Sequence, residues 1–181
     1  MPDTADLSMI ATSALPAAFT FLFQRLDVAL DRWRSGIEPE AEREPDVPAE
    51  LVGGLQLPLR IDTGRLADQA PALEILALAM AAYGQQPSLI TGDNTKLLET
   101  LARVRTALED VYGQRFTFQG ETRGKSGPLA DHQYGSVAGE VTGLAAGEAI
   151  RGSVVSRIRA ERVEPQGRIT GMKAPVIEDR G

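Results

Sequence analysis

The residues whose types and order come closest to a known chemistry lie at positions 120–126. They read Gly-Glu-Thr-Arg-Gly-Lys-Ser, and the run ends in Gly-Lys-Ser, as a phosphate-binding loop does. Such a loop needs four residues between its glycines so that its amides surround the phosphates, whereas three residues separate Gly120 from Gly124. The Gly-Pro pair that follows also prevents a regular helix from starting at Lys125. We therefore expect a flexible basic loop rather than a nucleotide site.

Other residue types that take part in catalysis are scattered along the C-terminal part. His132 is the only histidine, and we interpret it as an exposed loop residue. Ser136 lacks the flanking glycine spacing of a nucleophile elbow. Glu140 and Glu148 occupy polar positions near predicted turns, so we expect no catalytic carboxylate pair there. We assign no catalytic residue and predict that the protein is not an enzyme. The alternative is a small ligand-binding protein or enzyme that uses the loop 120–135.

The chain contains no cysteine and a single histidine. This excludes disulfides, thiolate metal sites and cysteine nucleophiles, and it leaves no pattern for a transition-metal site. We therefore predict no metal and no cofactor. The formal net charge of −6 argues against a general nucleic-acid binder, because such proteins usually carry a basic field that attracts phosphate.

The elements that carry these residues are predicted to form a mixed α+β fold. We divide the 181-residue chain into an N-terminal apolar helix, an acidic linker, a helical hairpin with flanking strands, a loop and a β-repeat unit. The predicted boundaries of these five segments are 1–34, 35–50, 51–119, 120–135 and 136–178.

The first segment combines an uncharged apolar run, residues 8–23, with an amphipathic tail, residues 24–33. We predict one helix from Ser8 to Arg34, with Pro16 as a break point. Its apolar face is so complete that it needs cover, from its own protein or from an oligomer partner. Membrane insertion of residues 8–23 is the alternative, although this run is shorter than the roughly 20 apolar residues of a confident span.

The acidic linker, residues 35–50, contains three prolines and six acidic residues. A segment with so little to bury is typical of a solvated tether. We expect it to let the first helix dock at a distance, on a protein partner or on another copy. The residues predicted to make this contact are Leu15, Phe19, Phe21, Leu22, Phe23, Leu26, Leu30 and Trp33.

Two helices are predicted in the central segment. The first runs from about residue 64 to 83 and is apolar on most sides, so we expect it to be buried on most sides. The second runs from about residue 93 to 112 and has an apolar stripe at spacings of three and four. We expect the pair to form an antiparallel hairpin, with short strands at 55–61 and 115–119 beside it.

The ends of these helices carry suitable capping residues. Asp62 or Thr63 precedes the first helix, and Asp93 or Asn94 precedes the second. Their side chains can accept hydrogen bonds from first-turn amides. Gly113 is suited to end the second helix, because glycine adopts the left-handed conformation of a helix C-terminus.

The C-terminal segment contains three copies of a 14-residue repeat. The parts of these copies that resemble one another, at 139–146, 153–160 and 167–174, share a small residue, a β-branched residue, a hydroxyl, a large apolar residue and Ala. Each copy suits a short strand in which Thr142 and Leu144 share one face. Such strands form either a β-solenoid-like stack or an ordinary meander. A short stack needs covered ends, so we expect self-association, with the helical part or a second chain as the cover.

This pattern predicts a non-enzymatic assembly or adaptor protein that docks through its N-terminal helix on a protein partner or on another copy. A membrane-associated protein that inserts residues 8–23 is the second hypothesis. The absence of cysteine is compatible with a cytoplasmic location, with membrane association as the alternative.

Overall fold

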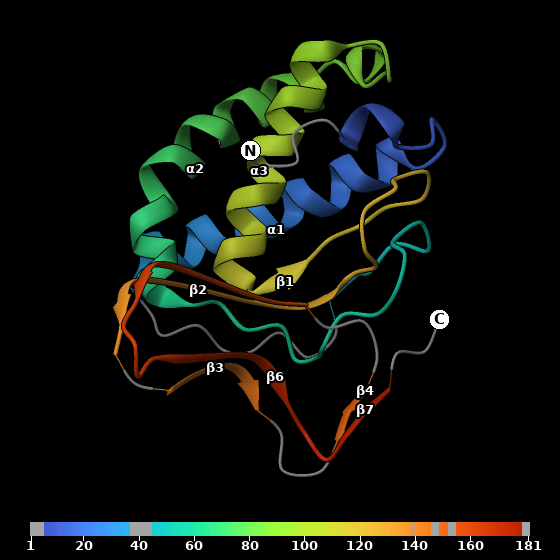
Figure 1. Cartoon of the computed structure of the whole chain (residues 1–181). Coiled ribbons are helices and arrows are strands. Elements are labelled where there is room, and N and C mark those ends of the chain that lie inside the picture. Colours follow the sequence, from blue (N-terminus) through green and yellow to red (C-terminus); the bar gives the residue numbers. More distant parts are fainter. Residues whose placement is uncertain (1–5, 37–44, 139, 146–148, 152–154, 179–181) are drawn as a thin grey trace.

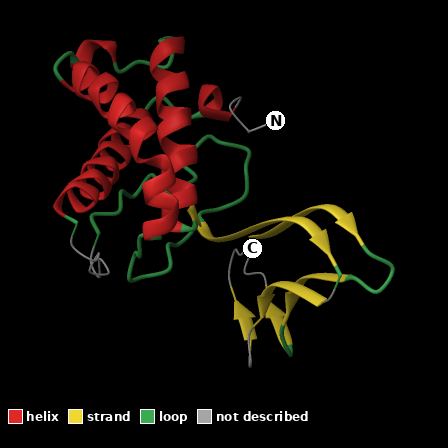
Figure 2. Cartoon of the chain, turned by 90° about the vertical axis from the view of Figure 1, so that its left-hand side faces the viewer, coloured by secondary structure: helices red, strands yellow, loops and turns green. Residues whose placement is uncertain are grey.

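Helices and strands occupy separate parts of the molecule, which confirms the mixed α+β architecture (Figure 1). The computed structural model describes residues 6–36, 45–138, 140–145, 149–151 and 155–178. We call residues 6–126 the helical unit and residues 127–178 the strand unit, which extends away from the helices (Figure 2). The elements in chain order are η1 (Asp6–Met9), α1 (Leu15–Ser35), α2 (Thr63–Gly84), η2 (Pro87–Leu89), α3 (Thr95–Tyr112), β1 (Gln114–Arg115), β2 (Gly127–Val137), β3 (Glu140–Ala145), β4 (Ala149–Arg151), β5 (Val155–Val163), β6 (Arg168–Lys173) and β7 (Val176–Glu178).

The first long helix, α1, begins at Leu15 rather than at the predicted Ser8. Pro16 lies in its first turn, where a missing N–H is tolerated because first-turn amides have no helical acceptor. In a helix interior the same proline would lose a hydrogen bond and clash with the preceding turn, which favours a helix start here, and the residues before it form the short helix η1 and a turn. Gly36 ends α1 in the left-handed conformation, with a φ of 62°.

The central hairpin agrees with the sequence prediction. α2 and α3 run in opposite directions side by side (Figure 1). Asp62 caps α2, because its carboxylate accepts a hydrogen bond from the Arg65 amide at 3.0 Å. Asn94 caps α3 in the same way, accepting from the Leu97 amide at 3.2 Å. Gly113 ends α3 with a φ of 60°.

One hydrophobic core joins all three helices. Phe21 of α1 contributes to it, with its ring centroid 5.3 Å from that of Phe116 and 6.1 Å from that of Phe118. Both of these partner rings are fully buried. The predicted boundaries at residues 34 and 50 therefore do not separate two cores, because α1 packs into the same core as the hairpin.

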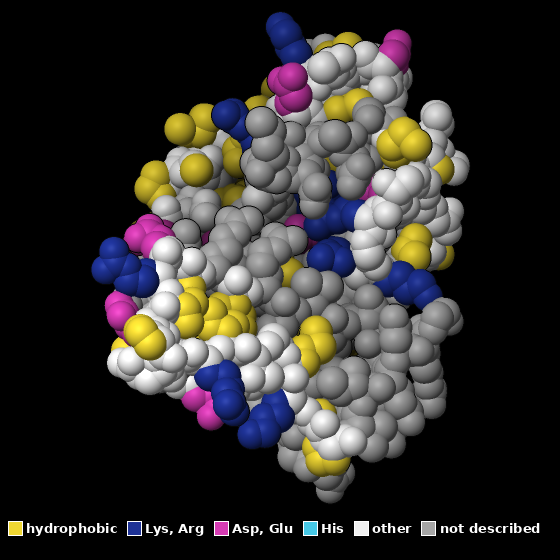
Figure 3. All heavy atoms as spheres, viewed as in Figure 1, with side chains coloured by type: hydrophobic (Ala, Val, Ile, Leu, Met, Phe, Trp, Pro, Cys, Tyr) yellow, Lys and Arg dark blue, Asp and Glu magenta, His cyan; other side chains and the backbone are white. Residues whose placement is uncertain are grey.

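The helix α2 is less covered than its apolar sequence predicts. Leu66, Leu73 and Met80 face the core and are buried. Ile75 and Leu78 point the other way and are exposed, and hydrophobic side chains gather over α2 at the upper left of Figure 3. The expectation of burial on most sides is wrong for this outward face, because the described residues leave it uncovered.

The strands expected beside the hairpin are shorter than predicted. In the strand predicted at 115–119, regular pairing is confined to β1, which pairs antiparallel with the start of β2. Beyond β1 the chain stays extended, and the Thr117 carbonyl accepts a hydrogen bond from the Val52 amide at 2.8 Å. Residues 55–61 form no named strand, since the proline among them has no N–H to donate to a ladder.

Residues 127–135, expected in a loop, belong instead to the 11-residue strand β2. β2 pairs parallel with β5, from Leu129 opposite Val155 to Val137 opposite Val163. The expectation failed because the polar composition of this segment masks a strand whose partner lies far along the chain, beyond β3 and β4. Backbone amides and carbonyls make the ladder, so a polar sequence does not prevent it.

The remaining strands of this unit also pair in parallel. Val141 of β3 lies opposite Ile169 of β6, and Ala149 of β4 lies opposite Val176 of β7. Parallel neighbours cannot be joined by hairpin turns, so these three pairs are not those of a meander. The β3–β6 register is also the one that aligns the first repeat copy with the third, residue for residue.

Burial alternates along β6 as the repeat predicts. Thr170 and Met172 are half-buried, whereas Ile169 and Lys173 are exposed. The side chains that the repeat assigns to one shared face are therefore the more covered ones in this strand.

Candidate functional site

The loop at residues 120–126 is held against α3 by charged side chains. The side chain of Glu121 is fully buried there and forms an ion pair with Arg105, whose side chain is also buried. The other carboxylate oxygen of Glu121 accepts a hydrogen bond from the Phe118 amide at 2.7 Å. A site for phosphate would instead present free amides and cations to solvent. The buried Arg105–Glu121 ion pair therefore holds the loop in place and does not form a phosphate site.

A second ion pair lies beside the first. Arg123 of the loop contacts Glu109 of α3 at 3.0 Å. The same carboxylate accepts a hydrogen bond from the Phe116 amide at 2.8 Å. The expectation of a flexible basic loop is therefore corrected: each of these two acidic side chains is bound both to an arginine and to a backbone amide.

Ser126, at the end of the Gly-Lys-Ser run, is engaged within the protein. Its hydroxyl accepts a hydrogen bond from the Thr117 amide at 2.8 Å and donates one to the Thr117 carbonyl at 3.2 Å. Ser126 is buried, whereas Lys125 is exposed. The two residues therefore do not face a common ligand position.

The other candidates from the sequence do not form a described cluster. His132 belongs to β2 rather than to the predicted loop, Ser136 also belongs to β2, and the side chains of both lie outside the described residues. Glu140 is the first residue of β3 and is exposed. Glu148 lies outside the described residues. Within the described ranges, no three potential metal-ligating side chains come together.

The side chains predicted to bind a partner lie mainly inside the protein. Six of them are in the hydrophobic core, Phe23 packs against it half-buried, and Trp33 is exposed. An amphipathic sequence has the same pattern whether its apolar face packs into the protein's own core or docks on a partner. This explains why these residues were predicted to bind a partner. The six core residues are Leu15, Phe19, Phe21, Leu22, Leu26 and Leu30.

The same burial bears on the proposed insertion of residues 8–23. In the described part of the chain, no helix has both the length and the apolar character needed to cross a membrane. The apolar run is divided between η1, a turn and the first part of α1.

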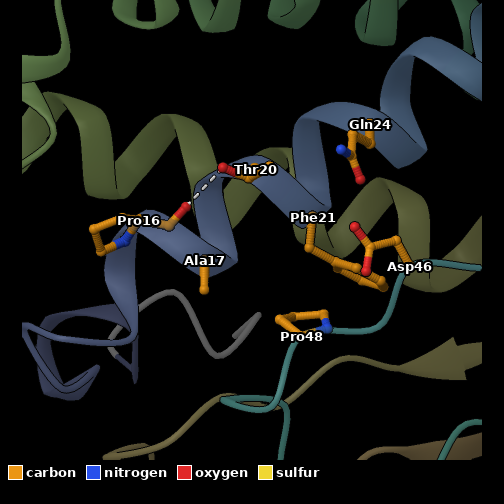
Figure 4. A pocket seen from close by; sticks show the side chains of 7 residues that line it. All are labelled: Pro16, Ala17, Thr20, Phe21, Gln24, Asp46 and Pro48. Atoms are coloured by element: carbon orange, nitrogen blue, oxygen red, sulfur yellow. Dashed lines mark hydrogen bonds between the residues drawn. The ribbon is translucent and has the colours of Figure 1, made fainter.

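A shallow groove of about 290 Å³ lies between α1 and the segment 45–48 (Figure 4). Phe21, Ala17 and Pro48 give it apolar walls. Thr20 lies at its edge, but the hydroxyl donates a hydrogen bond to the Pro16 carbonyl of its own helix at 3.0 Å. Asp46 is the one carboxylate in the lining and has no basic or nucleophilic partner there, so the groove offers no catalytic pair.

The strand unit presents a different kind of surface, made of backbone. Among the described residues, β3 and β6 pair only with each other, as do β4 and β7. β5 pairs on one side only, with β2. Each unpaired side carries a row of amide and carbonyl groups that another strand can bind. The sequence analysis expected a short stack with ends that need cover, but it did not predict which strands pair or in which direction, so it did not identify these edges.

Comparison with protein-family models, with curated proteins and with solved structures found no match to this chain.

Proposed function

We propose that this protein is a non-enzymatic assembly protein whose strand unit joins copies edge to edge. In this proposal, residues 127–178 make two turns of a short parallel β-solenoid, and a second copy extends the stack. The observation that carries it is the parallel pairing of three successive strands with the next three in the same order. The docking element in this proposal is therefore the strand unit, in place of the N-terminal helix predicted from the sequence.

The spacing of the pairs supports one turn for every two repeat copies. In the middle pair, β3 and β6, the first repeat copy lies opposite the third, so the partners are separated by two repeat lengths. The partners in the other two pairs, β2 with β5 and β4 with β7, are separated by nearly the same stretch of chain. Equivalent residues therefore return to the same position after one turn. Stacks of this kind bury their interior between successive turns.

The open edges support self-association. A stack of two turns is short, because each turn is covered only by its neighbours. The outer edges of β6 and β7 are unpaired among the described residues. Another copy offers strands of the same length, spacing and direction, so it can continue the ladder through backbone hydrogen bonds.

The test is light scattering of the full-length chain over a range of concentrations, with and without Thr170→Pro. Thr170 lies inside β6, where proline removes an amide from the ladder. We expect the wild type to form species larger than a monomer. We expect the variant to self-associate at least tenfold more weakly. Thr63→Pro is the matched control, because Thr63 is the first residue of α2, where proline is favoured.

A strictly monomeric wild type would remove the proposal. Association that survives Thr170→Pro unchanged would assign the contact to another surface. Circular dichroism of both variants checks that the helices keep their native signal.

A further inference from the structure

An apolar stripe runs along the outward face of α2. Pro71, Ile75, Leu78 and Ala82 follow one another at spacings of four, three and four, and all are exposed. Ile75 is 70% exposed and Leu78 is 75% exposed, the two highest values among the exposed large hydrophobic residues of the described chain. Single exposed apolar residues are ordinary, but a contiguous row on one helix face indicates an interaction surface.

A groove between α2 and α3 continues this stripe. Its volume is about 590 Å³, within the usual range of binding clefts. Ala72, Ile75, Leu76 and Ala107 form its apolar lining. The whole stripe covers roughly 16 Å of helix, which is longer than a small molecule covers. Apolar contacts at helical spacing are the recognition mode of an amphipathic helix in a groove.

The polar rim of the groove determines the charge of its occupant. The Thr106 hydroxyl donates a hydrogen bond to the Ala102 carbonyl at 2.9 Å. The Gln69 side-chain amide donates one to the Asp110 carboxylate at 3.3 Å. Arg103 is exposed at the same rim, and among the described residues it makes no ion pair. An exposed guanidinium beside an apolar cleft is complementary to a carboxylate.

We propose that the α2–α3 groove binds an amphipathic helix of a partner protein, with its apolar side chains on Ile75 and Leu78 and an acidic residue on Arg103. This surface is separate from the strand edges and does not depend on stacking. A second copy fits less well. The only acidic residue between positions 71 and 82 is Glu74, which already lies 3.5 Å from Arg34.

The test uses two synthetic 20-residue amphipathic peptides with the same leucine stripe, one flanked by Glu and one by Lys. Fluorescence anisotropy with the full-length chain should give at least tenfold tighter binding of the Glu peptide. Arg103→Glu should reverse this preference. The double change Ile75→Ser and Leu78→Ser should weaken binding of the Glu peptide at least tenfold.

A matched control is the double change Val163→Ser and Ile169→Ser, which removes two exposed apolar residues of the strand unit. It should leave peptide affinity unchanged. Equal affinity of the two peptides, or a preference that Arg103→Glu does not move, would overturn the proposal. Light scattering in which Ile75→Ser with Leu78→Ser abolishes self-association would also overturn it, because the occupant would then be a second copy.

Discussion

The described residues of the helical unit and of the strand unit differ in how deeply their side chains are buried. The helical unit buries a large set of aliphatic and aromatic side chains, including Phe21, Phe116 and Phe118, and two ion pairs hold its loop 120–126 against α3. In the strand unit, the described side chains are at best half-buried, apart from the first residue of β2. Its described strands are joined by parallel backbone ladders. A core buried within one chain needs no partner. A ladder with unpaired edges can form further backbone hydrogen bonds with the strands of a neighbour.

The strongest test of this contrast removes the centre of the helical core. Phe21→Ala should lower the free energy of unfolding by about 4 kcal/mol, because a large buried ring leaves a cavity. Ile169→Ala in the strand unit should change it by less than about 0.5 kcal/mol, since that side chain is exposed. Urea unfolding followed by circular dichroism at the helical signal measures both. Similar losses in the two variants would mean that the units do not differ in this way.

Breaking the buried ion pair between Arg105 and Glu121 should have the next largest effect. Glu121→Gln leaves Arg105 buried without its counter-charge, and we expect a loss of about 3 kcal/mol in the free energy of unfolding. Glu140→Gln, at an exposed position of the strand unit, is the matched control and should cost about 0.5 kcal/mol or less. Adding Arg105→Met to Glu121→Gln should recover part of the loss. No recovery would show that the arginine has another role.

The smallest expected effect concerns pH and Asp27 on α1. Partial burial, followed by the neighbouring Asp31, raises the pKa of Asp27 above its usual value of 3.8. The folded state therefore binds this proton more tightly than the unfolded state, and Asp27 contributes less to stability as pH rises through its folded pKa. Asp27→Asn should be slightly more stable than the wild type at pH 7, within about 0.5 kcal/mol.

Thermal unfolding of both proteins between pH 3 and pH 7 checks this sign. The difference between them should shrink toward acidic pH, where the Asp27 carboxyl is protonated in both states. A wild type that is the more stable protein at pH 7 would contradict the assignment.

The sequence was informative where local chemistry decides the structure. Asp62, Asn94 and Gly113 mark helix ends because capping depends on residues within one turn. These signals concern neighbours along the chain, so a single sequence contains them. The sequence repeat did not indicate which copies pair, and the structure places residues of the first copy opposite those of the third.

Contacts between distant and dissimilar residues were not predictable in the same way. The pairing of Arg105 with Glu121 joins a helix to a loop, and no spacing rule connects them. The strand character of β2 depends on β5, which follows only after two other strands. The burial of Phe21 within its own chain rather than on a partner depends on the position of Phe116 and Phe118, which the helix pattern does not contain.

The spacing between β3 and β6 also limits how this chain can change in length over generations. In the proposed stack, where the first repeat copy faces the third, inserting or deleting a single copy would turn every later strand by half a turn and place it opposite a different strand. Gain or loss of two copies together keeps every later strand opposite its equivalent. Descendants with longer or shorter C-terminal regions are therefore expected to differ by pairs of copies.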